Sequence, residues 1–208
     1  MANYEKYLQS PPDMPTGEKT SVRYGCSYRI EAARKQALLD APDIAHVVNC
    51  VNEALGLCGI QAVPKPVVES FCIDAEGYPL IDYEAIKKGY GLADVGDIVW
   101  IKLDEQGFPI VVAVSDDIYF GTPPASSAEY GERIIVRNSS GSEKEIPLHT
   151  THSIITHALS RKVDESKVLI FPLRSIPEPL RRGDVEQIIG NYLVECGVPL
   201  LDLYSHNF

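Results

Sequence analysis

Apolar residues in the first third of the chain recur with the period of an α-helix. Spacings of three and four place them on one face: Ile44, Val47, Val48, Val51 and Leu55. Asp40 can cap this helix, and Pro42 fits its first turn, where a missing N–H costs nothing. Gly56 and Gly59 end it. A helix is also expected over residues 27–39, with a shorter apolar stripe on one face.

Two stretches alternate apolar and polar residues, as β-hairpins do. The segments GDIVWIKL and FPIVVAV predict two strands joined by a turn at residues 104–107. ERIIVR and EKEIPL predict a second pair, joined at residues 138–142. Between the hairpins, Pro123 and Pro124 exclude a central strand, so residues 122–131 are expected to form a surface loop and possible lid.

The last forty residues predict a strand, a helix and a second strand. KVLIFPL is a buried type of strand, GDVEQIIGNYLVECG a helix, and VPLLDLY the second strand. Asp184 and Gln187 form a capping pair, and Gly197 ends the helix. The helix turns one apolar stripe inward: Val185, Ile188, Ile189, Tyr192, Leu193 and Cys196. Two apolar strands joined by one helix favour a right-handed parallel crossover.

These elements predict a mixed α+β or α/β fold with a single mixed sheet. Antiparallel hairpins form its centre, a parallel β-α-β unit its C-terminal part, and the N-terminal helices pack on it. Residues 9–20, QSPPDMPTGEKT, hold three prolines and a glycine, which favour neither helix nor central strand. Residues 1–20 are therefore expected to be a flexible lead-in, and residues 21–208 a single globular domain.

Composition narrows the class of protein. The 208 residues carry a formal net charge of −10, which repels a phosphate backbone and argues against nucleic acid as a partner. Arg174, Arg181 and Arg182 are the densest basic group and are read as a solvated rim rather than a phosphate site. Five cysteines without a CxxC pair indicate free thiols in a reducing compartment. With no apolar leader or membrane-length apolar run, we expect a soluble cytoplasmic protein.

Cys26, in RYGCSYRIEAARK, is the first candidate for chemistry. A thiol just before a helix N-terminus faces free amide donors and the positive end of the helix dipole, which favour thiolate. Arg23 adds positive charge and is a candidate substrate-binding residue, and Gly25 lets a substrate approach the backbone. The alternative is that Cys26 is a small buried hydrophobe, the usual role of a cysteine.

A cysteine nucleophile needs a base, and LHTTHSIITH is the histidine-rich segment. His149 and His152 are the candidate catalytic imidazoles, and Tyr119 a candidate substrate contact beside the proline loop. The order of early cysteine, GDIVWI hairpin and late histidine resembles papain-like amidases of the NlpC type. That resemblance implies a cysteine- and histidine-dependent hydrolase or acyl transferase. The chain departs from the pattern because no histidine directly follows the GDIVWI strand.

Other resemblances and site types compete with this interpretation. GCSY resembles the nucleophile box of SGNH esterases, and this resemblance implies Ser27 as the nucleophile with Asp202 and His206. The chain departs from that pattern in two ways. Asp202 and His206 are four positions apart rather than three, and a Gly-x-Asn-Asp box is absent. The hairpin of residues 96–117 resembles the opening of MazF-type toxin barrels. A metal site would need three histidines with a nearby carboxylate: His149, His152, His157 and Asp116 or Asp117. On a continuous helix His152 and His157 are five apart and diverge, so no metal is expected. His46 and Cys50 share a helix face, a spacing more typical of partial burial.

A second class of function is a noncatalytic binding or regulatory protein. Eleven tyrosines on an acidic chain could supply aromatic anchors for a protein partner, with Tyr119, Phe120 and Tyr130 around the proline loop. No P-loop or dinucleotide motif occurs, so no cofactor is expected. The partners considered are therefore a small-molecule or peptide substrate, or another protein, with the oligomeric state left open.

Overall fold

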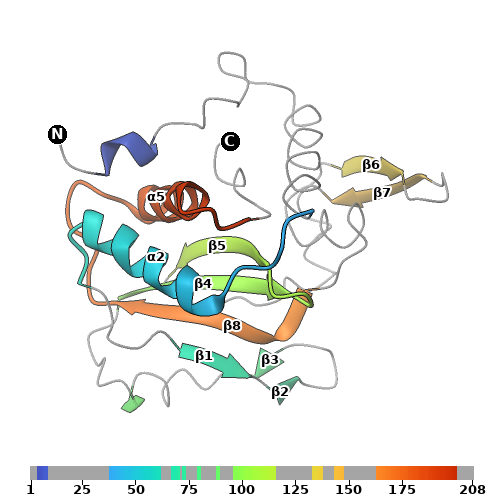
Figure 1. The fold of residues 1–208 in the computed structure, drawn as a ribbon, viewed down its shortest axis with the longest axis horizontal. Coiled ribbons are helices and arrows are strands. Elements are labelled where there is room, and N and C mark those ends of the chain that lie inside the picture. Colours follow the sequence, from blue (N-terminus) through green and yellow to red (C-terminus); the bar gives the residue numbers. More distant parts are fainter. Residues whose placement is uncertain are drawn as a thin grey trace.

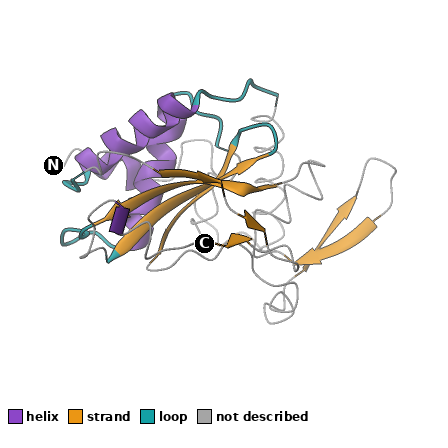
Figure 2. Cartoon of the chain, turned by 90° about the horizontal axis from the view of Figure 1, so that it is seen from below, coloured by secondary structure: helices purple, strands orange, loops and turns teal. Residues whose placement is uncertain are grey.

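The computed structural model describes residues 4–8, 38–61, 67–70, 72–73, 79–80, 88–89, 96–115, 133–137, 143–147 and 163–200. Within them the chain is a mixed α+β protein, as the sequence predicts. A four-stranded antiparallel sheet carries two 14-residue helices, α2 (Ile44–Leu57) and α5 (Arg182–Glu195), on one face. Figures 1 and 2 show these helices side by side above the strands.

The main sheet has the strand order β1-β8-β4-β5. Its strands are β1 (Val67–Ser70), β8 (Val163–Leu173), β4 (Asp97–Asp104) and β5 (Pro109–Ser115), and each pairs antiparallel with its neighbour. Two further strand pairs are separate: β2 (Cys72–Ile73) with β3 (Pro79–Leu80), and β6 (Arg133–Arg137) with β7 (Glu143–Pro147). Both predicted hairpins therefore form, but only β4–β5 belongs to the main sheet. Among the described residues the strands form three separate sheets, which corrects the prediction of a single sheet.

The core lies between this sheet and the helices. Strand register aligns Phe171, Val99 and Val114 in one row across three strands. With the row beside it, these residues make up the helix-facing surface of the sheet: Val99, Ile101, Val112, Val114, Leu169, Phe171 and Leu173. The opposite face is buried in part as well, because Ile98 and Ile170, which alternate with Val99 and Phe171, are each no more than 3% exposed. Burial on both faces explains the nearly continuous apolar runs of β4, β5 and β8.

The β4–β5 turn forms where the sequence predicts it. The Asp104 carboxylate accepts hydrogen bonds of 2.9 Å from the amides of Gln106 and Phe108, and the Gly107 amide donates to the Asp104 carbonyl. Gly107 has a φ of +90°, which a residue with a side chain rarely adopts. This turn sets the register that buries Val99 and Ile101 against the helices.

The apolar stripes of both helices are confirmed, but their N-terminal caps differ from prediction. Asp43, not Asp40, is the N-cap of α2, and its carboxylate accepts from the Ala45 amide at 3.0 Å. In α5 the N-cap is Arg181, whose amide donates to the Asp184 carboxylate at 2.8 Å. Asp184 thus acts from the third helical position rather than as the cap of a pair with Gln187. The Arg182 side chain forms an ion pair with Asp97 at the start of β4.

The predicted parallel β-α-β unit is not found among the described residues. Its first strand and its helix are present as β8 and α5, but Val198–Leu200, where the second strand should begin, is a buried segment outside any strand. Every described strand pair is antiparallel. Residues 201–204, the rest of the predicted strand, lie outside the described residues.

A buried glutamate joins α5 to the outer strand of the sheet. Glu186 is 7% exposed, and its Oε2 accepts a 2.8 Å hydrogen bond from the Val114 amide of β5. Because β5 is last in the strand order, this bond satisfies an amide that has no neighbouring strand on that side. The helix therefore covers the edge as well as the face of the sheet.

Part of the predicted lead-in is structured. Residues Glu5–Leu8 form a 3-10 helix, η1, which packs against α5. Tyr7 is 5% exposed, and its carbonyl accepts from the Asn191 side chain at 2.6 Å. Of the helix predicted over residues 27–39, only Leu38 and Leu39 are described. They lie in a turn and are exposed, so the helix does not extend to that point.

Candidate functional site

The catalytic and substrate-binding residues predicted from the sequence all lie outside the described part of the chain. These are Cys26, His149, His152, Arg23 and Tyr119. The same holds for the residues of the competing readings: Ser27, Asp116, Asp117, Phe120, Tyr130, His157, Asp202 and His206. All of these assignments remain predictions from sequence.

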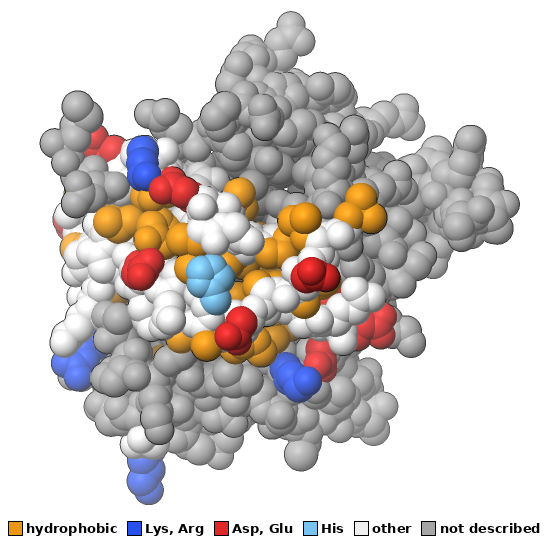
Figure 3. Space-filling model, viewed as in Figure 1, with side chains coloured by type: hydrophobic (Ala, Val, Ile, Leu, Met, Phe, Trp, Pro, Cys, Tyr) orange, Lys and Arg blue, Asp and Glu red, His pale blue; other side chains and the backbone are white. Residues whose placement is uncertain are grey.

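The described chemistry is concentrated where α2 and α5 pack against each other. His46, Cys50 and Glu53 follow one another on α2 at spacings of four and three, so they share a face. Tyr192 and Cys196 do the same at the end of α5, which lies alongside. Figure 3 views this side of the molecule and shows acidic side chains and histidine at the surface among hydrophobic ones.

The first part of this interface is a thiol cluster formed by His46, Cys50 and Cys196. His46 Nε2 lies 3.0 Å from the carbonyl oxygen of Cys196, and the Cys50 sulfur lies 3.8 Å from each nitrogen of the His46 ring. The Cys196 side chain is also a hydrogen-bond partner of the Cys50 thiol. Two cysteines far apart in the sequence and one imidazole therefore lie close together.

Accessibility distinguishes the two thiols of the cluster. Cys50 is 2% exposed, whereas Cys196 is partly exposed at the end of α5. Burial, with a smaller contribution from the hydrogen bond to Cys196, raises the pKa of Cys50 to about 12. Cys50 is therefore a protonated thiol at neutral pH, and a reagent in solution meets Cys196 first.

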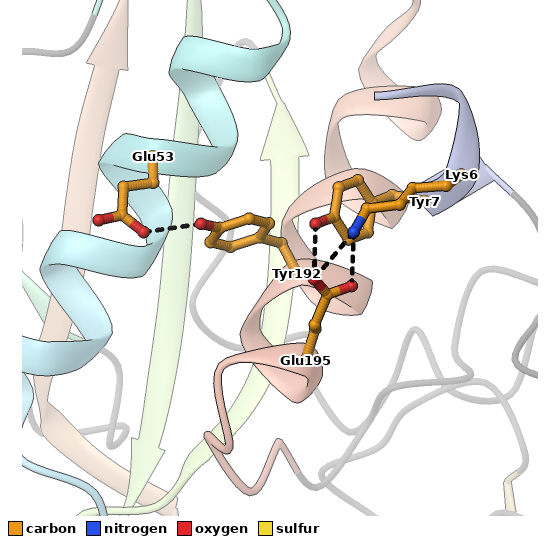
Figure 4. Close-up of polar contacts among 5 residues, drawn as sticks. All are labelled: Lys6, Tyr7, Glu53, Tyr192 and Glu195. Atoms are coloured by element: carbon orange, nitrogen blue, oxygen red, sulfur yellow. Dashed lines mark hydrogen bonds and ion pairs between the residues drawn. The ribbon is translucent and has the colours of Figure 1, made fainter. Parts of the chain in front are cut away.

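The second part of the interface is a hydroxyl–carboxylate network that Figure 4 shows in close-up. The Tyr192 hydroxyl donates to Glu53 at 2.7 Å across the two helices, and this bond raises the pKa of Tyr192. The Tyr7 hydroxyl donates to Glu195 at 3.1 Å, and the Lys6 ammonium lies 2.8 Å from the same carboxylate.

These contacts give the two tyrosines an internal role. Their rings pack edge to face at 5.3 Å, and each hydroxyl is bonded to a carboxylate of a neighbouring helix. Tyr7 and Tyr192 therefore hold η1, α2 and α5 together. They lend no support to the hypothesis of a tyrosine-bearing binding surface, whose proposed residues, 119–130, are not described.

The remaining described thiol and the possible metal ligands complete the picture. Cys58 is 3% exposed at the end of α2, and burial raises its pKa to about 11. At neutral pH, Cys50 and Cys58 are therefore both protonated thiols at rest. Within the described ranges, no group of three or more histidine, cysteine, aspartate or glutamate side chains is placed to hold a metal ion.

Sequence reasoning found half of the thiol cluster. The shared face of His46 and Cys50 follows from their spacing, and Cys196 belongs to the predicted inward stripe of the last helix. What links them is the side-by-side packing of α2 and α5, which no local pattern specifies. The available signal was partial: Cys196 belongs to the predicted apolar stripe of the last helix, whereas Cys50 lies next to Val51 but outside the predicted stripe of its own helix.

Comparison with known proteins gives no relative: no protein family, no curated protein and no solved structure matches this chain. Among the described helices, none is long and apolar enough to cross a membrane.

Proposed function

We propose that the protein is a small cysteine- and histidine-dependent hydrolase or acyl transferase, with Cys26 as the nucleophile and His149 or His152 as the base. The supporting observation is the state of the described thiols. Cys50 and Cys58 are sealed in the core with raised pKa values, and the one described imidazole, His46, is engaged with the Cys196 carbonyl. Cys26, flanked by arginines and placed before a predicted helix, has the better environment for a thiolate.

The chemistry would follow the usual course of a thiol nucleophile. His149 or His152 takes the Cys26 proton, and the thiolate attacks the carbonyl carbon of an ester, thioester or amide. The leaving group departs with a proton returned by the imidazole, which leaves an acyl group on sulfur. Water completes hydrolysis, and a second nucleophile completes acyl transfer. Arg23 would hold a negatively charged group of the substrate, and Tyr119 an apolar one.

The cellular setting belongs to the same proposal. We place the protein in the cytoplasm, because an activated thiol survives in a reducing compartment and because Cys50, Cys58 and Cys196 are free thiols. The net charge of −10 favours a small-molecule or peptide substrate over nucleic acid. The alternative is a noncatalytic module that binds a protein through residues 119–130. It predicts that the partner protein is bound without being chemically changed and that the chain has no reactive thiol.

Residue-resolved alkylation tests the proposal. Iodoacetamide is applied across a pH series, and mass spectrometry measures the rate at each cysteine in the folded chain and in the chain unfolded by urea. Cys26 should react faster folded than unfolded at neutral pH. In a panel of chromogenic esters and thioesters, Cys26→Ala and His149→Ala or His152→Ala should lower turnover by roughly 100-fold or more.

The matched control is Cys58→Ala, which removes a buried thiol and should leave ester turnover unchanged. Two results contradict the proposal. One is a Cys26 alkylation rate no higher in the folded than in the unfolded chain. The other is a turnover that survives Cys26→Ala.

A further inference from the structure

Two cysteines distant in sequence share a hydrogen-bonded cluster. Cys50 lies in the middle of α2, and Cys196 is the C-cap of α5. His46 links them, since its ring contacts the Cys50 sulfur at 3.8 Å and the Cys196 carbonyl at 3.0 Å. α2 and α5 pack side by side on the sheet (Figure 1), which brings these residues of the two helices together.

The imidazole has a defined orientation in this cluster. A carbonyl oxygen can only accept, so His46 Nε2 must donate to the Cys196 carbonyl. In the neutral ring this leaves Nδ1 unprotonated, and Nδ1 is 3.8 Å from the Cys50 sulfur. The geometry therefore provides a proton acceptor for the buried thiol.

We propose that Cys50 and Cys196 form a reversible disulfide that joins α2 to α5, with Cys196 as the attacking thiol, Cys50 as the resolving thiol and His46 as the proton acceptor. The oxidant is a low-molecular-weight disulfide. This inference is independent of the proposed role of Cys26, since none of the three residues belongs to that site.

The reaction is a pair of thiol–disulfide exchanges. The Cys196 thiol loses its proton to solvent, and its thiolate attacks one sulfur of the oxidant; the S–S bond of the oxidant breaks and its first thiolate leaves and takes up a proton. Cys50 then gives its proton to His46 and attacks the Cys196 sulfur, which releases the second thiol of the oxidant. In total, two protein thiols are oxidised to one disulfide, and the oxidant disulfide is reduced to two thiols.

The asymmetry of the two thiols makes this order specific. Cys196 is partly exposed and open to a reagent, whereas Cys50 is buried and meets only partners inside the cluster. A mixed disulfide at Cys196 would lie next to Cys50, so it would resolve quickly. Cys58 offers the contrast, because it is equally buried and its pKa is raised by burial alone.

The first experiment maps the disulfide in the full-length chain carrying Cys26→Ala, which removes any adduct at the proposed catalytic thiol. The reduced protein is equilibrated with mixtures of reduced and oxidised glutathione, free thiols are blocked, and peptides are analysed by mass spectrometry. The expected product is a Cys50–Cys196 cross-link. Because the cross-link closes most of the chain into a loop, the oxidised protein should also show a Tm higher by roughly 5 °C or more.

Variants separate the steps. With Cys50→Ser, Cys196 should accumulate a stable glutathione adduct, whereas with Cys196→Ser, Cys50 should stay unmodified. Cys58→Ser is the matched control and should form the cross-link as the parent does. His46→Gln keeps a side-chain amide that can donate to the Cys196 carbonyl but removes the proton acceptor. The mixed disulfide should therefore resolve more slowly, by a factor of up to roughly ten.

Three outcomes overturn the proposal: both thiols remain free at every glutathione ratio, the cross-link joins a different pair of cysteines, or Cys50→Ser and Cys196→Ser give the same adduct pattern. Each of these outcomes leaves the test of Cys26 unaffected, because that test measures alkylation and ester turnover in a chain with Cys26 present.

Discussion

The two helices end in the same way, yet their terminal cysteines have different surroundings. α2 ends in LGLCGI and α5 in LVECGV. In each, the amide two residues past the C-cap cysteine donates to a leucine carbonyl, from Ile60 to Leu55 and from Val198 to Leu193, both at 2.9 Å. Gly59 and Gly197 follow the cysteines with φ of +71° and +78°. These are two copies of one helix-ending motif.

Their tertiary positions separate the two cysteines chemically. Cys58 lies in the core, where its pKa is raised by burial. Cys196 lies at the edge of the α2–α5 interface, beside His46 and Cys50. The same local sequence thus places one thiol in an apolar environment and the other in a polar cluster. A cysteine at a helix end acquires its chemistry from the element that packs beside it.

The largest expected effect comes from truncating the buried leucine at each helix end, which tests whether the two ends are equally well packed. Leu55 and Leu193 are both 0% exposed. Truncation to alanine should destabilise the fold by about 2–5 kcal/mol at each position, because each leaves a cavity under its helix. Urea unfolding measures both. A cost below about 1 kcal/mol at either leucine would show that its helix end is not part of the core.

A smaller effect tests the shared turn. Gly59→Ala and Gly197→Ala should each cost about 1–2 kcal/mol, since a side chain disfavours positive φ. An added Cβ would meet no atom within 4 Å at either site, so the cost comes from the backbone alone and should be similar in both. Gly56→Ala, inside α2 and equally open, is the control and should stabilise slightly. Thermal unfolding compares the three, and unequal losses at Gly59 and Gly197 would contradict a common motif.

The smallest effect concerns the residue before each cysteine, Leu57 in α2 and Glu195 in α5. The hydrogen bond from Lys6 lowers the pKa of Glu195 below its ordinary value of 4.5. A carboxyl group whose pKa is lowered by folding stabilises the fold at pH values above its pKa in the unfolded state. This contribution is lost as the pH falls through its pKa in the folded state.

Wild type should therefore lose slightly more stability than Glu195→Gln as the pH falls below 4.5. The difference should be small because both side chains are exposed, and high salt should reduce it. Urea unfolding midpoints over an acidic pH series provide the measurement. In a Lys6→Met background, Glu195→Gln should no longer change the pH dependence of the midpoint. Parallel pH profiles of wild type and Glu195→Gln would rule out this contribution.

Much of the described fold follows from local patterns. The apolar stripe from Ile44 to Leu55 locates α2, and Gly197 marks the end of α5. The β4–β5 hairpin follows from the alternation of apolar and polar residues and from the turn at Asp104–Gly107. The cap of α2 was misplaced because Asp40 and Asp43 both precede the helix, and local sequence does not show which carboxylate reaches a free amide. Asp43 is adjacent to the first turn, and its carboxylate bonds the Ala45 amide.

The sequence alone determined what depends on neighbours along the chain: the apolar stripes, the turn at Gly107 and the matching helix ends at Gly59 and Gly197. Tertiary structure alone decided the antiparallel strand order, the sealing of the β5 edge by Glu186, and the meeting of Cys50 with Cys196. The physical reason is range. Dihedral preferences and periodicity act over a few residues, whereas strand order and helix pairing follow from burying the largest apolar area among elements far apart in sequence.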